Sequence, residues 1–158
     1  MMDEDVKRWT ARRKRGAYAQ AIGTSRGGRT NKLHALTDDR GRPRVLLLSA
    51  GNINEMIMAA ELIQTAGPFD RLIADRGYDT NAMRGLVAAK GAEAIIPATT
   101  SRRAPIPRNT KAYRLPNIVE RLWWRLKDWR RIATRYDKLA ANYLSGAPIA
   151  ASITYWCN

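Results

Sequence analysis

A short apolar run, a helix and a second apolar run follow one another in the middle of the chain, and this succession constrains the fold most. Residues 70–75 predict the first strand, and residues 92–97 predict the second. Between them, Asp79 or Thr80 can cap a helix that Gly91 closes. A strand–helix–strand unit of this length joins two parallel strands by a crossover, so the sequence predicts an α/β fold.

Upstream of this unit the pattern is that of an antiparallel hairpin. Residues 32–37 and 44–49 predict two strands on either side of a turn that contains Asp and Gly. The second strand is apolar on both faces, which is typical of a strand in a covered sheet. Asn54 then predicts the start of a helix that runs to about Ala66 and stops at Gly67-Pro68.

Three segments complete the chain downstream. Residues 98–116 are rich in Pro and Arg and predict a long connection. Residues 117–136 have a helical period with an apolar stripe and a polar one: Ile118, Leu122 and Leu126 form the first, and Glu120, Trp124, Lys127 and Arg131 form the second. Residues 139–156 predict a final apolar helix that Gly146 and Pro148 would break or kink.

Length and charge indicate one basic globular domain. The chain has 158 residues, 45% of them hydrophobic and 27% charged, which is typical of a folded domain. Lys and Arg number 28 against 14 acids, a net charge of +14 that favours nucleic acid as a partner. An acidic protein or an anionic membrane surface is the alternative. Residues 1–30 carry basic runs and predict an arm or loop, so the folded domain is expected over residues 31–158.

Cysteine content and hydropathy narrow the environment. Cys157 is the only cysteine, so neither an intrachain disulfide nor a zinc cluster is expected. No run of 18 apolar residues and no secretory leader pattern occurs in the sequence, which favours the cytoplasm and no membrane.

Two acidic residues stand where chemistry can occur. Asp75 follows the predicted parallel strand at its carboxyl end, the sheet edge at which sites gather. Glu120 lies in the first turn of a basic helix. Each also has a plain structural explanation, as a surface acid at a turn or as an acid that complements the helix dipole. Together, two or three converging carboxylates can hold Mg²⁺ for DNA strand cleavage. His34, alone in a strand, is expected to be packed or hydrogen-bonded.

Three motifs extend this interpretation. Residues 20–35 read QAIGTSRGGRTNKLHA, residues 73–79 read IADRGYD, and residues 117–138 begin with NIVER and end with RRIATRYDK. In this order they resemble the DDE transposases of bacterial insertion sequences, and the resemblance extends over about residues 16–145. It implies an RNase H-like mixed sheet flanked by helices, an Asp-Asp-Glu site with Mg²⁺ or Mn²⁺, and cleavage and transfer of DNA strands.

The same resemblance assigns roles to individual residues. Asp75 corresponds to the second aspartate and Glu120 to the glutamate, both as catalytic metal ligands. The signature Tyr-Arg-Glu-Lys of one group of this family matches at Tyr113, Glu120 and Lys127, whereas Pro116 replaces its arginine. The residues expected to contact DNA are Arg26, Lys32, Tyr113, Trp124, Arg125, Lys127, Arg130 and Arg131. The alternative to DNA contact is a structural role, in which at least one tryptophan packs into the core and the arginines are only solvated.

The first aspartate of the family has no clear counterpart. The resemblance therefore implies that the family's first strand is lacking here, and Asp3 or Asp5 is the candidate remnant of the residue that ends it. A transposase split over two reading frames would receive this strand from an upstream-frame partner chain. The expected partners are therefore the element's DNA ends, target DNA, that partner chain and a second copy of the protein. The alternative function is a truncated, inactive remnant that binds DNA.

Overall fold

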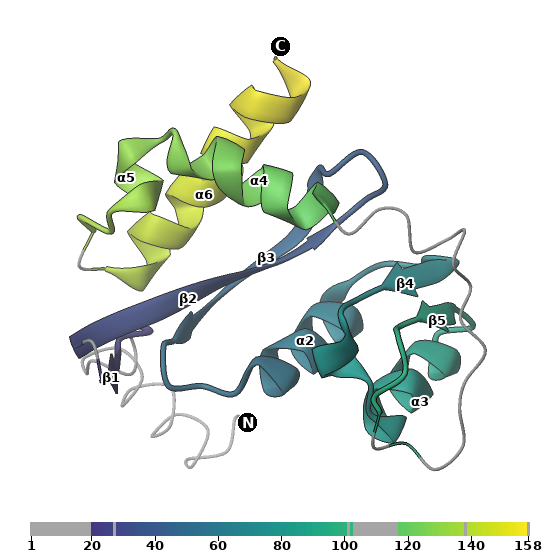
Figure 1. Cartoon of the computed structure of the whole chain (residues 1–158). Coiled ribbons are helices and arrows are strands. Elements are labelled where there is room, and N and C mark those ends of the chain that lie inside the picture. Colours follow the sequence, from purple (N-terminus) through teal and green to yellow (C-terminus); the bar gives the residue numbers. More distant parts are fainter. Residues whose placement is uncertain (1–19, 27, 101, 103–116, 138, 158) are drawn as a thin grey trace, which may run out of the picture.

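A long antiparallel ribbon of two strands separates the structure into two layers. The ribbon consists of β2 (Gly28–Thr37) and β3 (Pro43–Ala50). The computed structural model describes residues 20–157 except 27, 101, 103–116 and 138. One layer contains α4 (Asn117–Lys127), α5 (Arg130–Ala133) and α6 (Ala140–Trp156), and the other contains α2 (Glu55–Thr65), β4 (Arg71–Ile73), α3 (Asn81–Ala89) and β5 (Glu93–Ile95) (Figure 1).

The ribbon is the predicted hairpin, with strands longer than expected. Asp38 builds its turn, because the carboxylate accepts hydrogen bonds from the backbone N–H groups of Arg40 and Arg42 at 3.0 and 2.9 Å. Gly41 has φ +82°, a left-handed conformation that favours glycine. A short strand, β1 (Gly23–Ser25), pairs with the beginning of β2. Residues 23–30, expected in the arm or loop, are therefore mostly strand.

Alternation along the ribbon distributes its side chains between the two layers, as a period of two requires. Leu33 and Ala35 of β2, with Leu46 of β3, pack against the buried residues of α4, α5 and α6. Leu36 points the other way and packs against the core of α2, α3, β4 and β5. One hairpin thus serves two hydrophobic cores.

The crossover unit is confirmed. The strands β4 and β5 pair in parallel, with Leu72 opposite Ala94, and α3 connects them. Thr80 is the N-cap of α3, since its hydroxyl accepts a hydrogen bond from the Met83 N–H at 3.1 Å. Asn54 caps α2 as predicted, by accepting from the Met56 N–H at 2.8 Å.

The hairpin and the parallel pair form two separate sheets, which corrects the expectation of one mixed sheet. In the described part of the chain, the order β1-β2-β3 makes one sheet and β4-β5 makes the other. No described strand hydrogen-bonds to both β2 and β4, so hydrophobic packing through Leu36 joins the two instead.

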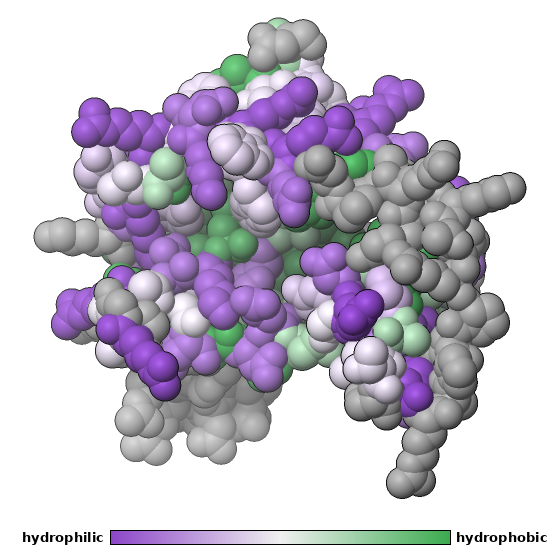
Figure 2. Space-filling model, in the orientation of Figure 1, coloured by the Kyte–Doolittle hydropathy of each residue, from purple (hydrophilic) through white to green (hydrophobic). Residues whose placement is uncertain are grey.

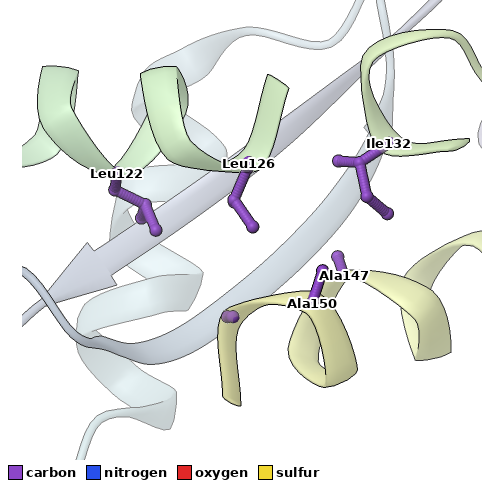
Figure 3. Packing of buried hydrophobic residues seen from close by; sticks show 6 residues of the cluster. Leu122, Leu126, Ile132, Ala147 and Ala150 are labelled. Carbon is purple, nitrogen blue, oxygen red and sulfur yellow. The ribbon is translucent and has the colours of Figure 1, made fainter. Parts of the chain in front are cut away.

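The helix predicted over residues 117–136 is broken. Trp129 has an extended backbone, with φ −82° and ψ 97°, and separates α4 from α5. The break brings Ile132 into the core with Leu122 and Leu126 of α4 and with Ala147 and Ala150 of α6, where the side chains point toward one another (Figure 3). Helix α6 continues through Pro148, so of the predicted break or kink the break is wrong. Among the described residues, no helix has the length and apolar character needed to cross a membrane.

Candidate functional site

Asp75 lies on an exposed turn at the carboxyl end of β4, as the sequence predicts. The parallel ladder continues one residue past the strand, because the Ala74 N–H donates to the carbonyl of Ile95 at 3.3 Å. The chain then enters the 3-10 turn η1 (Arg76–Tyr78), and the Asp75 carbonyl accepts the Tyr78 N–H at 2.9 Å. The carboxylate is accessible from solvent at the sheet edge, where a ligand can approach it.

Tyr78 lies within electrostatic range of both Asp75 and Glu55 of α2. Burial raises the pKa of its phenol above the ordinary value, and the nearby carboxylates of Glu55 and Asp75 raise it further. Glu55, in the first turn of α2, forms an ion pair with Lys32 of β2 at 3.0 Å. Lys32, expected to contact DNA, therefore has an acidic partner within the protein. The surroundings of Asp75 thus carry both signs of charge.

His34 extends from the same strand and is hydrogen-bonded, as expected. Its Nε2 lies 2.8 Å from the Ser49 hydroxyl on β3. Burial lowers the pKa of the imidazole, so the neutral form is favoured in the folded protein. This hydrogen bond joins β2 to β3 across the hairpin.

Asp79 is a further functional candidate, which the sequence placed at the end of the IADRGYD motif and otherwise predicted as a helix cap. Its carboxylate is buried and accepts hydrogen bonds from Arg84 at 2.8 Å, from Arg102 at 2.9 and 3.1 Å, and from the Thr99 N–H at 2.7 Å. The hydrogen bonds from Arg102 hold the pKa of Asp79 far below its ordinary value, against the opposing effect of burial. The sequence signal that could have indicated this role is the spacing of Asp79, four residues after Asp75 and five residues before Arg84.

Glu120 projects from α4 into solvent, as the two-stripe pattern predicts. Ile118, Leu122 and Leu126 are buried beneath the helix, whereas Glu120, Trp124 and Lys127 are exposed on the outside. Trp124 is 75% exposed, while Trp123 packs partly against the core. The outward stripe therefore presents one acid, one large ring and one cation side by side along the helix.

The far end of this helix borders a surface hollow of about 570 Å³. Arg125 lines it and stacks over the ring of Tyr155, with its guanidinium carbon 4.9 Å from the ring centroid. Trp129 forms another wall and donates from its indole N–H to the Thr154 hydroxyl at 3.3 Å. Asp128 also lines the hollow. A cation beside aromatic rings can bind phosphate or stack on a base.

The remaining predicted cations are arranged differently. Arg26 is exposed in the turn after β1, and Arg130 is exposed at the start of α5. Arg131 instead forms a bidentate pair with Asp137, at 2.8 and 2.9 Å. The stripe of α4 does not continue to Arg131, because the helix ends at Lys127. Arg131 thus stabilises the segment between α5 and α6 through its pair with Asp137.

Two predicted site residues, Asp3 and Tyr113, and the substituted position Pro116 lie outside the described residues. Within the described part of the chain, no three His, Cys, Asp or Glu side chains gather closely enough to hold a metal ion. Asp75 and Glu120 stand in the two different layers of the fold. Their oxygen atoms are the ligands that Mg²⁺ prefers, so the donor chemistry fits while the described donor set is incomplete.

Comparisons with known proteins agree with one another. Residues 3–145 match the family described as the transposase DDE domain. A Brucella ovis protein named as a transposase for insertion sequence element IS6501 is 26% identical over 127 residues, covering 80% of this chain and 98% of that protein. A Burkholderia cepacia protein named as a transposase for element IS402 is 29% identical over 147 residues, covering 86% of this chain and 65% of that protein. No solved structure shows a significant match.

Proposed function

The chain belongs to the transposase DDE domain family, and from this we propose that it is a transposase catalytic region that cleaves and transfers DNA strands with a divalent metal. Family membership implies an RNase H-like fold. The observation that carries the proposal is the exposure of Asp75 and Glu120, both within the matched range and at the expected element positions. We assign both residues as metal ligands.

The metal would be Mg²⁺ or Mn²⁺, because the two donors are hard carboxylate oxygens. When bound, such an ion activates a water or hydroxyl group and stabilises the leaving oxygen of the phosphodiester. Two carboxylates leave the site short of a ligand. We propose that a third comes from outside the described residues, either from Asp3 or from an upstream-frame partner chain.

The protein's own contribution is to bind and orient DNA beside these carboxylates. Lys127 lies two turns beyond Glu120 on the same exposed stripe, so its ammonium can neutralise a phosphate near the reacting one. Trp124, between them, offers a face on which an unpaired base can stack. Hydrophilic side chains cover much of the face seen in Figure 2, including the side of the helices α4 and α5 that faces the viewer. The net charge of +14 adds long-range attraction for DNA.

Cleavage of a supercoiled plasmid that carries the element's ends tests this function. We expect Mg²⁺-dependent nicking by the full chain, and loss of nicking in Glu120→Gln. Glu93→Gln is the matched control, because it makes the same chemical change at an exposed glutamate on β5, away from both carboxylates. Equal nicking by all three proteins would refute the role of Glu120.

A second candidate function is a DNA-binding remnant with an incomplete metal site. The incomplete donor set in the described part of the chain and the replacement of the signature arginine by Pro116 favour it. This candidate predicts salt-sensitive DNA binding with no nicking by any of the proteins. Addition of the upstream-frame product distinguishes the two, since a split transposase gains nicking activity and a remnant does not.

A further inference from the structure

Asp79 is a buried, ionised carboxylate that neither the proposed metal site nor the DNA contacts use. Its side chain has no exposed surface, while those of Arg84 and Arg102 are 16% and 19% exposed. A buried charge persists only where it is paired and hydrogen-bonded, and this carboxylate accepts four hydrogen bonds. Because both carboxylate oxygens accept hydrogen bonds, the position of the Asp79 side chain is fixed by its partners.

The backbone of Asp79 ends the turn that begins at Asp75. The Asp79 N–H donates to the carbonyl of Arg76 at 3.0 Å, and the Tyr78 N–H donates to the carbonyl of Asp75 at 2.9 Å. These two hydrogen bonds close a single tight turn. A displacement of Asp79 is therefore transmitted directly to Asp75 through η1.

The side chain of Asp79 connects this turn to two further segments. Arg84 of α3 also donates to the carbonyls of Ala94 and Ile96, at 3.2 and 2.6 Å, and so fastens α3 to β5 and the residue after it. Arg102 also donates to the amide oxygen of Asn81 at 2.8 Å. Since Arg102 follows β5 on the way to α4, the turn, the helix and the start of the connection to Glu120 are tied at one point.

We propose that Asp79 is the positioning residue for Asp75. Its carboxylate ties the turn after β4 to α3, to Thr99 and to Arg102, and thereby holds the Asp75 carboxylate in one place at the sheet edge. The inference rests on the proposed function, because it takes Asp75 as a metal ligand. Rigid placement matters there, since displacement of a reacting group by about 1 Å can cost about 100-fold in rate.

Backbone amide exchange of the full chain tests the positioning without any activity. Asp79→Asn preserves size and removes the charge, and Asp137→Asn is the control because it breaks an equally bidentate but exposed Asp–Arg pair. In Asp79→Asn we expect the Tyr78 amide to exchange about tenfold faster relative to the Leu122 amide, a ratio that compares local opening of the turn with opening of the core that contains Leu122. In Asp137→Asn the ratio is unchanged. An unchanged ratio in Asp79→Asn overturns the proposal.

Arg102→Lys supplies a conservative comparison. Lysine keeps the positive charge but lacks the planar fork that reaches both carboxylate oxygens, so we expect an exchange ratio between those of the wild type and Asp79→Asn. A ratio equal to that of the wild type would show that charge alone suffices and would overturn the role of the bidentate geometry.

Plasmid nicking measured per DNA-bound chain supplies the functional readout. At a temperature where all variants are folded, Asp79→Asn should lose about 100-fold in the nicking rate while its DNA affinity stays at the wild-type level. A parallel fall in both quantities means that Asp79 only maintains the fold, which overturns the proposal. If the wild type does not nick DNA even after the upstream-frame product is added, the proposed function fails at that step, and the amide exchange ratio alone decides the positioning role.

Discussion

Truncation of Leu122 tests whether the helix that carries Glu120 is anchored as the structure describes. Leu122 has no exposed surface and packs in the core with Leu126, Ile132 and Ala147. Leu122→Ala removes the atoms of a fully buried side chain and leaves a cavity among neighbours on three helices. We expect the free energy of unfolding to fall by roughly 3 kcal/mol, within the range of about 2–5 kcal/mol for such changes.

Trp124→Ala is the control on the same helix, two residues away. It deletes a larger side chain, but Trp124 is 75% exposed, so we expect a loss of less than about 0.5 kcal/mol. Urea denaturation followed by far-ultraviolet circular dichroism measures both variants, and an unchanged slope with urea shows that the same folded state is compared. Binding of single-stranded DNA should show the reverse order, with a loss of about 1–3 kcal/mol in Trp124→Ala when a stacked base is lost.

Comparison of the two variants tests which face of α4 is buried. If Trp124→Ala destabilises the protein as much as Leu122→Ala does, α4 presents a different face to the core than the structure shows. The outward placement of Glu120 and Lys127 would then be wrong as well.

Four further outcomes are expected. DNA affinity measured by fluorescence anisotropy should fall steeply between 50 and 200 mM salt, by roughly 10³-fold or more if six or more phosphates are neutralised, and a flat response would contradict a phosphate-binding surface. The pKa of Asp79 is lowered in the folded state, so its contribution to stability is complete at neutral pH and is lost as the pH falls below the ordinary carboxyl value. The melting temperature of Asp79→Asn should therefore fall less than that of the wild type between pH 5 and pH 3, a range of about two units around that value. The pKa of His34 is lowered by burial, so protonation favours the unfolded chain, stability falls as the pH drops through 6.5, and His34→Gln should flatten the melting profile there. Thr80→Ala removes the cap of α3 and should lower the free energy of unfolding by about 1 kcal/mol, with an unchanged urea midpoint counting against the cap.

Local signals in the sequence were sufficient to predict most of the elements. Asn54 and the Gly67-Pro68 stop bound α2, and the Asp/Gly turn predicts the hairpin, because capping and turn conformations depend on a few adjacent residues. The parallel pairing of β4 and β5 followed from the length of the crossover. The face of α4 that carries Glu120 followed from periodicity, whereas the proposed roles of Asp75 and Glu120 as metal ligands rest on the family motifs.

The remaining features depend on contacts between residues far apart in sequence. No local pattern at Trp129 announces the end of α4, since the break is stabilised by Ile132 entering a core made with α6. The division into two sheets depends on strand pairing, since β2 pairs with β1 and β3 whereas β4 pairs with β5. The local sequence predicts Asp79 as a helix cap, whereas in the structure its carboxylate accepts hydrogen bonds from Arg102, 23 residues later. Sequence alone predicted most of the elements and the residues that could carry chemistry. Only the tertiary structure decided which charged groups are engaged within the protein, because hydrogen bonds and ion pairs between distant residues form only when packing brings them together.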